Sequence, residues 1–164
     1  PRCCSSAASD VYKRQTIICG FMKIHGHTVG VLGNNGSLFP DSSQKAAHFI
    51  QLCNQISIPL VFLQNITGFN IGKEFEQNGS IKKGAQMLNA VSNSEVPHLT
   101  VILGNSYGAG TYAMSGREFG NAFTFLWPTA KIAVMGGEQI AGVMSMVRRA
   151  KAMRDGLPLS LIHI

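Results

Sequence analysis

The chain has 164 residues, of which 45% are hydrophobic, and its formal net charge is +6. This composition supports one modest core and excludes a large multidomain chain. No apolar run approaches the roughly 20 residues that span a bilayer, and no charged start followed by an apolar stretch indicates a signal peptide. We therefore expect a soluble domain, or a piece of one.

The two ends of the sequence look foreign to the rest. Residues 1–15 have no apolar periodicity and resemble translated adapter or vector sequence, and LSLIHI at the other end gives the same impression. We treat 1–15 and 157–164 as non-native flanks, and 16–156 as the folded segment. Setting the flanks aside leaves Cys19 and Cys53, which are too far apart in sequence for a zinc site or a disulfide framework. Two buried thiols in a reducing compartment are the expectation.

The first predicted elements are two short strands, over residues 17–24 and 28–33, followed by the loop NNGSLFPD. His25 and His27 lie between them. Both side chains would point to one face of a strand, yet no third ligand has the spacing of a metal site. We therefore expect no metal in this domain.

A helix is predicted next, with Asp41 or Ser42 as its N-cap and an end before Pro59. Apolar residues at three- and four-residue spacing form one stripe on it, which consists of Ala46, Phe49, Ile50, Cys53 and Ile56. The run LVFLQN, residues 60–65, is apolar on both alternating faces. Such a run favours a strand that is covered on both sides.

The same order of elements then repeats. A loop leads to a helix over about 80–93, and LTVILG, residues 99–104, is a second strand expected to be covered on both sides. The stripe of this second helix consists of Ile81, Ala85, Leu88 and Val91. A glycine-rich turn and a short helix follow, then strands over 123–127 and 131–134 and a last helix from about Gly137 to Met153. The alternation predicts an α/β fold whose loops gather at the carboxyl ends of parallel strands.

The segment GNSYG, residues 104–108, matches the G-x-S-x-G pattern of a hydrolase nucleophile elbow. A hydrolase of that class needs an acid and then a histidine after the serine, and the only downstream histidine is His163, inside a suspected flank. We therefore disfavour Ser106 as a nucleophile. The overlapping Gly108-Ala109-Gly110 offers another interpretation, a turn that leads into a helix and acts through its backbone.

Positive charge gathers near the end of the last predicted helix, at Arg148, Arg149, Lys151 and Arg154. No aromatic residues interleave with these charges, so a solvated helix end is favoured over a nucleic-acid surface. We expect neither nucleic acid nor membrane as a partner, although this basic end could meet an acidic neighbour.

Four longer segments carry a specific resemblance. They are GNNGSLFPDSSQKAAHFIQLC, IPLVFLQNITGFNIGKEFE, VPHLTVILGNSYGAGTYAMSGR and FLWPTAKIAVMGGEQIAGV. Together they resemble the carboxyltransferase (beta) subunits of biotin-dependent acyl-CoA carboxylases, and within that family those of the methylcrotonoyl-CoA carboxylases. The resemblance covers roughly residues 16–156.

This resemblance implies a crotonase-like fold of repeated ββα units, of which the chain holds only the C-terminal carboxyltransferase half. It implies carboxyl transfer from carboxybiotin to 3-methylcrotonyl-CoA in leucine degradation. The biotin would arrive on a carrier domain of a partner alpha subunit, and only that partner would use ATP. Two halves from different beta subunits would form the active site at a dimer interface within a higher oligomer. The segment alone is expected to be inactive, and its place would be the mitochondrial matrix or the bacterial cytoplasm.

The resemblance also implies roles for particular residues. The backbone N–H groups of Ala109 and Gly110 would form an oxyanion hole for biotin, and small residues there would let the ligand approach closely. Loops at the ends of the strands would line the acyl-CoA and biotin pockets, with Gly33, Asn34, Asn35, Gly36, Thr67, Gly68, Phe69, Tyr107 and Gly108 as substrate-binding residues.

Two other functions stay open at this stage. One is a carboxyltransferase for another acyl-CoA, such as geranyl- or propionyl-CoA, although QNITGF and GAG argue mildly against propionyl-CoA. The other is a non-catalytic crotonase-like scaffold.

Overall fold

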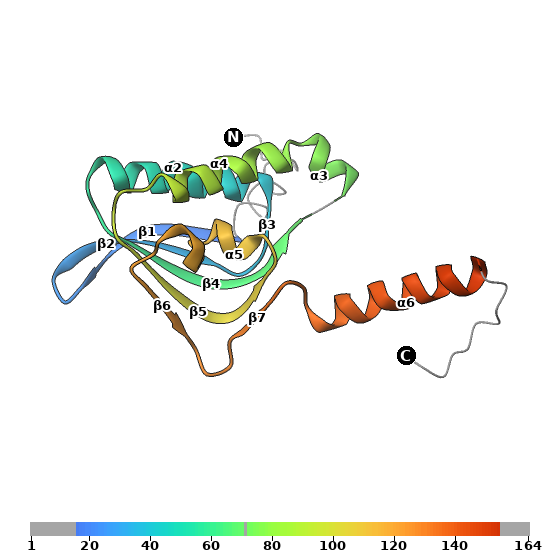
Figure 1. Ribbon diagram of the computed structural model, residues 1–164. Helices are drawn as coiled ribbons and strands as arrows, with labels where there is room; N and C mark the ends of the chain where they lie inside the picture. The colour runs from blue at the N-terminus through green and yellow to red at the C-terminus, as the bar shows by residue number, and fades with distance from the viewer. Residues whose placement is uncertain (1–15, 71, 155–164) are drawn as a thin grey trace, which may run out of the picture. The chain divides into compact units, whose positions relative to one another are not determined.

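A computed structural model describes residues 16–70 and 72–154 (Figure 1). The two predicted flanks therefore lie outside the described residues. The chain divides into two compact units, with the boundary in the sequence between Ile132 and Ala133. The first holds a mixed sheet and the helices that cover it, and the second holds helix α6 (Gly137–Arg154).

The sheet of the described residues has seven strands. They are β1 (Ile17–Ile24), β2 (His27–Asn34), β3 (Gly36–Leu38), β4 (Leu60–Phe69), β5 (His98–Tyr107), β6 (Phe123–Leu126) and β7 (Lys131–Ala133). The main path runs β1-β2-β4-β5-β6, while β3 pairs with β4 and β7 with β5. Strands β1 and β2 pair antiparallel, whereas the pairs β2–β4, β3–β4, β4–β5 and β5–β6 are parallel.

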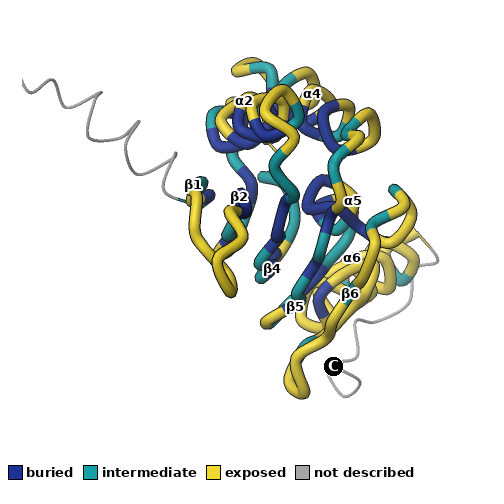
Figure 2. The backbone as a smooth tube through the Cα atoms, turned by 90° about the vertical axis from the view of Figure 1, so that its left-hand side faces the viewer, coloured by how far each residue is buried: buried dark blue, intermediate teal, exposed yellow. Residues whose placement is uncertain are grey.

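Between the strands lie helices α2 (Pro40–Gln55), α3 (Lys73–Gln77), α4 (Ser80–Ser92) and α5 (Gly110–Ala113), and the 3-10 turn η1 (Arg117–Phe119). Helices α2 and α4 lie side by side over one face of the sheet (Figure 1). Buried residues gather between these helices and the strands (Figure 2). None of the described helices is both long and apolar enough to cross a membrane.

The hairpin of β1 and β2 closes through two residues with positive φ, His25 at 48° and Gly26 at 85°. Two consecutive left-handed residues match the right-handed twist of paired strands, which is why such short loops are favoured in hairpins. The two predicted strands are thus confirmed. Both histidines are exposed, and no group of three potential metal ligands occurs among the residues that the structure describes.

The N-cap of helix α2 lies two or three residues before the predicted cap. Pro40 is the first residue of the helix and Phe39 is the N-cap, so the prediction of Asp41 or Ser42 as the cap is wrong. Proline is favoured at this position because its φ is already helical and its missing N–H is not needed there. The Ser42 hydroxyl oxygen instead accepts a hydrogen bond from the Phe39 N–H at 2.9 Å.

The predicted stripe of α2 is confirmed except at its end. Its members Ala46, Phe49, Ile50 and Cys53 are buried in the core. Ile56 is 49% exposed because it lies just beyond the last turn of the helix.

The predicted stripe of α4 is only half confirmed: Val91 is buried and Leu88 packs against the core, but the other two members face solvent. Ile81 is 77% exposed and Ala85 is also exposed, while the buried face consists of Ser80, Gly84, Met87, Ala90 and Val91. The small residues let the helix approach its neighbours: a Cβ on Gly84 would lie 3.2 Å from Cε1 of Phe69. Close packing at Gly84 therefore sets the face that α4 turns toward the sheet.

Two short elements, β3 and α3, occupy segments that the sequence predicts as loops. Both are too short for a periodic apolar pattern. Strand β4 is buried on both faces over most of its first half, as predicted, but β5 is not: Leu103 is 40% exposed. The last helix is confirmed to within one residue, and none of its residues is buried.

Candidate functional site

The residues predicted to bind substrate lie at the carboxyl ends of three neighbouring strands. Strand β2 ends at Asn34, β4 at Phe69 and β5 at Tyr107. Because β2, β4 and β5 run parallel, these ends share one edge of the sheet. This is the edge where open α/β sheets place their ligands. The structure thus brings the three predicted segments together, although β4 and β5 run longer than predicted: Thr67–Phe69 and Tyr107 are strand residues and not loop residues.

Hydrogen bonds between side chains, and between side chain and backbone, join these segments directly. Ser37 and Thr67 share a hydrogen bond at 3.0 Å between their hydroxyl oxygens. Asn65 donates through Nδ2 to Oδ1 of Asn35 at 2.9 Å, and its Oδ1 accepts the backbone N–H of Asn105 at 2.9 Å. The carboxyl-terminal parts of β4 and β5 and the segment that follows β2 therefore form one connected edge.

The glycine-rich turn follows β5 at this edge. Gly108 adopts a φ of 59°, and Ala109 is the N-cap of α5 with helical φ and ψ of −63° and −18°. The N–H groups of Thr111, Ala113 and Met114 hydrogen-bond to backbone carbonyls within the turn. Across residues 16–70 and 72–154, the N–H groups of Ala109 and Gly110 meet no such acceptor.

Two N–H groups without an internal partner are what an oxyanion hole requires. Ala109 is exposed, whereas Gly110 is buried. Helix α5 has only four residues, so its dipole is small and the local N–H groups matter more.

The absence of a side chain at Gly110 has a packing cause. A Cβ built there would overlap the Ile66 side chain and lie 3.4 Å from Cα of Gly68. The close approach of α5 to β4 is therefore enough to require glycine at this position, and the contact of Gly110 with a ligand stays a prediction.

Ser106 lies in an environment that suits structure rather than nucleophilic attack. It is fully buried, and its Oγ shares a hydrogen bond with Oγ1 of Thr111 at 2.8 Å. The buried histidine nearest in sequence, His98, uses both ring nitrogens elsewhere: Nδ1 lies 3.0 Å from Ser115 Oγ and Nε2 lies 2.7 Å from Ser94 Oγ. Burial lowers the pKa of His98, so it is neutral at pH 7.

The two cysteines are likewise unsuited to chemistry at neutral pH. Burial raises the pKa of the Cys19 thiol to about 11, and it also raises the pKa of Cys53. The thiolate is the reactive form of cysteine, so both groups stay protonated and unreactive. Both are free thiols in the structure.

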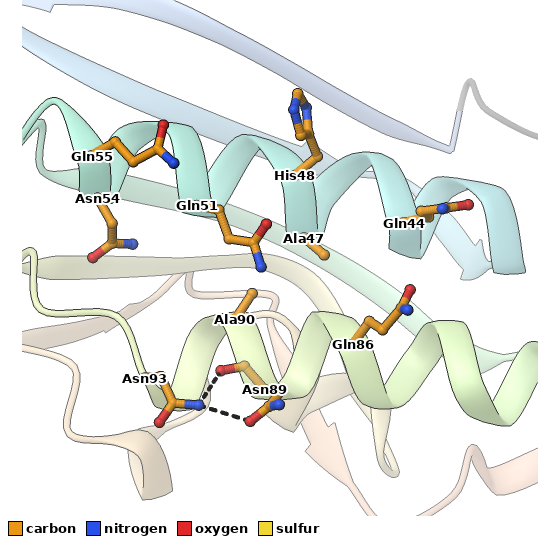
Figure 3. A pocket seen from close by; sticks show the side chains of 10 residues that line it. All are labelled: Gln44, Ala47, His48, Gln51, Asn54, Gln55, Gln86, Asn89, Ala90 and Asn93. Carbon is orange, nitrogen blue, oxygen red and sulfur yellow. Dashed lines mark hydrogen bonds between the residues drawn. The ribbon is translucent and has the colours of Figure 1, made fainter.

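Two hollows lie beside helix α4. One, of about 300 Å³, is almost entirely apolar and adjoins Phe69 at the end of β4; α4 supplies Ile81, Gly84, Ala85 and Leu88 to its wall. The other lies between α2 and α4, away from the strand ends, and is lined mainly by glutamine and asparagine side chains (Figure 3). Only the first is continuous with a loop predicted to bind substrate.

Comparison with known proteins decides the family. The model of the carboxyl transferase domain matches residues 12–161. The chain belongs to the carboxyl transferase domain family. The mitochondrial methylcrotonoyl-CoA carboxylase beta chain of Arabidopsis thaliana is 53% identical over 151 residues, which are 90% of this chain and 26% of the relative. A probable beta chain of the same name from Drosophila melanogaster is 53% identical over 89% of this chain and 25% of its own length.

Solved structures agree with this membership. The geranyl-CoA carboxylase beta subunit of P. aeruginosa superposes with a TM-score of 0.82 at 47% identity, over 87% of this chain and 28% of that one. A transcarboxylase 12S structure gives a TM-score of 0.76 at 38% identity, over 79% of this chain and 26% of its own. These neighbours confirm the crotonase-like α/β fold of this carboxyl transferase domain. The chain spans about a quarter of the length of these relatives.

Sequence reasoning missed two features of the carboxyl transferase domain. Asn65, which links all three loops, looks in the sequence like an ordinary strand-end residue, and no pattern singles it out. The apolar hollow beside Phe69 did leave a signal, because its wall contains Ile81, Ala85 and Leu88, the stripe that was assigned to the core.

Proposed function

We propose that this chain is part of a carboxyltransferase beta subunit that transfers a carboxyl group from carboxybiotin to 3-methylcrotonyl-CoA in leucine degradation. The observation that carries the proposal is the pair of unpartnered N–H groups at Ala109 and Gly110, placed at the shared edge of the parallel strands. The similarity to methylcrotonoyl-CoA carboxylase beta chains supports the choice of substrate.

Carboxybiotin would supply the carboxyl group and leave negative charge on its ureido oxygen. The backbone N–H groups of Ala109 and Gly110 would hold that charge, and donors fixed in advance cost no reorganisation during the reaction. Neither group gives up an internal hydrogen bond to do so. Removing one such donor typically costs on the order of 10²- to 10³-fold in rate.

The loops on either side would hold the two substrates. The substrate pocket would have two walls and a turn between them. One wall would consist of Gly33, Asn34, Asn35 and Gly36. The other would consist of Thr67, Gly68 and Phe69, and the turn would contain Tyr107 and Gly108. The apolar hollow beside Phe69 would exclude water from an apolar part of a ligand.

The proposed partners follow from the family. Biotin would be carried by an alpha subunit, which alone would use ATP, and the active site would be completed by another beta subunit. Eukaryotic relatives carry mitochondrial names, so the proposed place is the mitochondrial matrix in a eukaryote and the cytoplasm in a bacterium.

A second substrate is favoured by one observation. The geranyl-CoA carboxylase beta subunit is 47% identical and superposes closely, whereas propionyl-CoA carboxylase beta chains are 36% and 37% identical. Geranyl-CoA is therefore the leading alternative substrate.

The test is carboxyl transfer by the full-length subunit that carries this segment, assayed with the alpha subunit and 3-methylcrotonyl-, geranyl- and propionyl-CoA. We expect the highest kcat/KM with 3-methylcrotonyl-CoA. A preference for geranyl-CoA would move the assignment to the alternative, and no transfer to any of the three would contradict the proposed function.

A further inference from the structure

The ladder between β4 and β5 is irregular just before the glycine-rich turn. Gln64 lies opposite Ile102 and Ile66 lies opposite Ser106, so the single residue Asn65 faces the three-residue segment 103–105. Such a bulge removes main-chain hydrogen bonds from both strands. Buried backbone groups left in this way need other partners.

Asparagine side chains replace the lost bonds. The Oδ1 of Asn65 accepts the backbone N–H of Asn105 at 2.9 Å, and the backbone N–H of Asn65 donates to Oδ1 of Asn34 at 3.2 Å. Nδ2 of Asn65 donates to Oδ1 of Asn35 at 2.9 Å. One short amide thus connects the ends of β2, β4 and β5.

Gly104, which precedes Asn105 in the bulge, packs directly against the Asn65 side chain. A Cβ on Gly104 would lie 2.5 Å from Oδ1 of Asn65, so only glycine leaves room for the amide. Beyond it, Asn105 accepts the Tyr107 hydroxyl through Oδ1 at 3.1 Å. The network therefore runs from Asn65 to the residue that precedes the Gly108 turn.

We propose that Asn65 is a positioning residue, which holds the bulged segment 103–105 in place and so fixes the N–H groups of Ala109 and Gly110 at the shared edge of the strands. The inference rests on the proposed function and deepens it. An amide is required because the position needs an acceptor toward Asn105 and a donor toward Asn35 on the same short side chain. Leucine matches its shape and supplies neither.

The test compares substitutions of Asn65 in the full-length subunit with a matched control. In Asn65→Leu, we expect kcat for carboxyl transfer to fall by up to ~10²-fold, the scale of a misplacement of about 1 Å, with a smaller change in KM for the acyl-CoA. Hydrogen exchange measured by mass spectrometry should become faster in peptides that cover residues 103–108. Asn65→Asp keeps the acceptor for the Asn105 N–H, so it should restore slow exchange and part of kcat.

The matched control is Asn54→Leu. Asn54 has an analogous role at the opposite end of β5, where Oδ1 accepts the Glu95 N–H at 2.8 Å and Nδ2 donates to Ser94 Oγ at 2.8 Å. Loss of the Asn54 amide should lower Tm and leave kcat near the wild-type value.

Three outcomes would overturn the proposal: wild-type kcat in Asn65→Leu, an equal loss of kcat in Asn54→Leu, or unchanged exchange at residues 103–108. If Asn65→Leu does not fold, Asn65→Ala takes its place as the variant without the amide. In that case Asn65→Asp would contradict the proposal if its hydrogen exchange were that of the wild type but its kcat were no higher than that of Asn65→Ala. Absence of transfer in the wild-type subunit would refute the proposed function instead, while the exchange comparison would still decide whether Asn65 orders the segment.

Discussion

At the residue scale, small changes of environment separate structural groups from groups available for catalysis. Ser106 and Ala109 are three residues apart, yet the serine hydroxyl is buried and paired whereas the alanine is exposed with its N–H unpartnered. The side chain that looks catalytic in the sequence therefore serves the turn, and the backbone beside it carries the donors.

Ser106→Ala should keep most of the carboxyl transfer activity of the full-length subunit. The change removes one hydrogen bond to Thr111, which costs about 1 kcal/mol of stability. Steady-state kinetics and Tm check this. A loss on the order of 10⁴-fold in kcat, as when a triad nucleophile is removed, would instead restore the hydrolase interpretation.

Gly110→Ala should destabilise the fold through the Ile66 side chain. The new Cβ overlaps that side chain, and overpacking of this kind costs about 1–3 kcal/mol. Urea unfolding of the single variant and of Gly110→Ala with Ile66→Val provides the measurement. The second substitution should recover part of the loss; no recovery would show that Ile66 is not the cause.

At the element scale, the sequence predicts where most helices and strands lie, but it does not reliably predict which side of a helix is buried. The stripe of α2 was identified correctly because Ala46, Phe49, Ile50 and Cys53 all meet the sheet. The predicted stripe of α4 is wrong at Ile81 and Ala85, which are exposed. The helix instead buries Gly84 and Ser80, which carry no apolar signal but allow close packing. An apolar pattern shows which side of a helix is hydrophobic, but it does not show where a small residue lets the helix pack closely against its neighbours.

The orientation of α4 can be tested by truncation. Met87 is fully buried, so Met87→Ala should lower the free energy of unfolding by about 2–5 kcal/mol. Ile81→Ala should cost far less, because Ile81 is 77% exposed. Chemical denaturation measures the free energy of unfolding of both variants. A larger loss in Ile81→Ala than in Met87→Ala would show that Ile81 faces the core, as the stripe predicts.

In the candidate site, too, one part could be predicted from the sequence and another could not. The loops at Asn34, Thr67 and Gly108 were predictable, since parallel strands place their carboxyl ends together. The amide network of Asn65 was not, because it depends on a three-residue bulge that no local sequence pattern encodes.

At the scale of the whole molecule, much apolar surface remains outside the core. The rings of Phe123 and Phe125 on β6 stack against each other yet are 62% and 54% exposed, and Trp127 is 57% exposed. Soluble monomers seldom carry contiguous apolar surface of this kind. It suits a segment that represents a quarter of its relatives' length.

We expect the isolated segment 16–156 to self-associate or aggregate, because exposed strand β6 and its aromatic residues offer an edge for other chains. Light scattering at micromolar concentration checks this. A monodisperse monomer would contradict the expectation.

The central claim is that backbone N–H groups at the glycine-rich turn stabilise negative charge, and Ala109→Pro tests it most directly. The φ of Ala109, −63°, already has the value of proline, and its N–H makes no internal hydrogen bond, so the substitution removes the donor at little structural cost. The measurement is kcat for carboxyl transfer by the full-length subunit, together with Tm, with Ala109→Ser as the control that retains the N–H. The account predicts a loss on the order of 10²- to 10³-fold in Ala109→Pro at near-normal Tm, and near-normal activity in the control. Wild-type transfer by a folded Ala109→Pro subunit would contradict it.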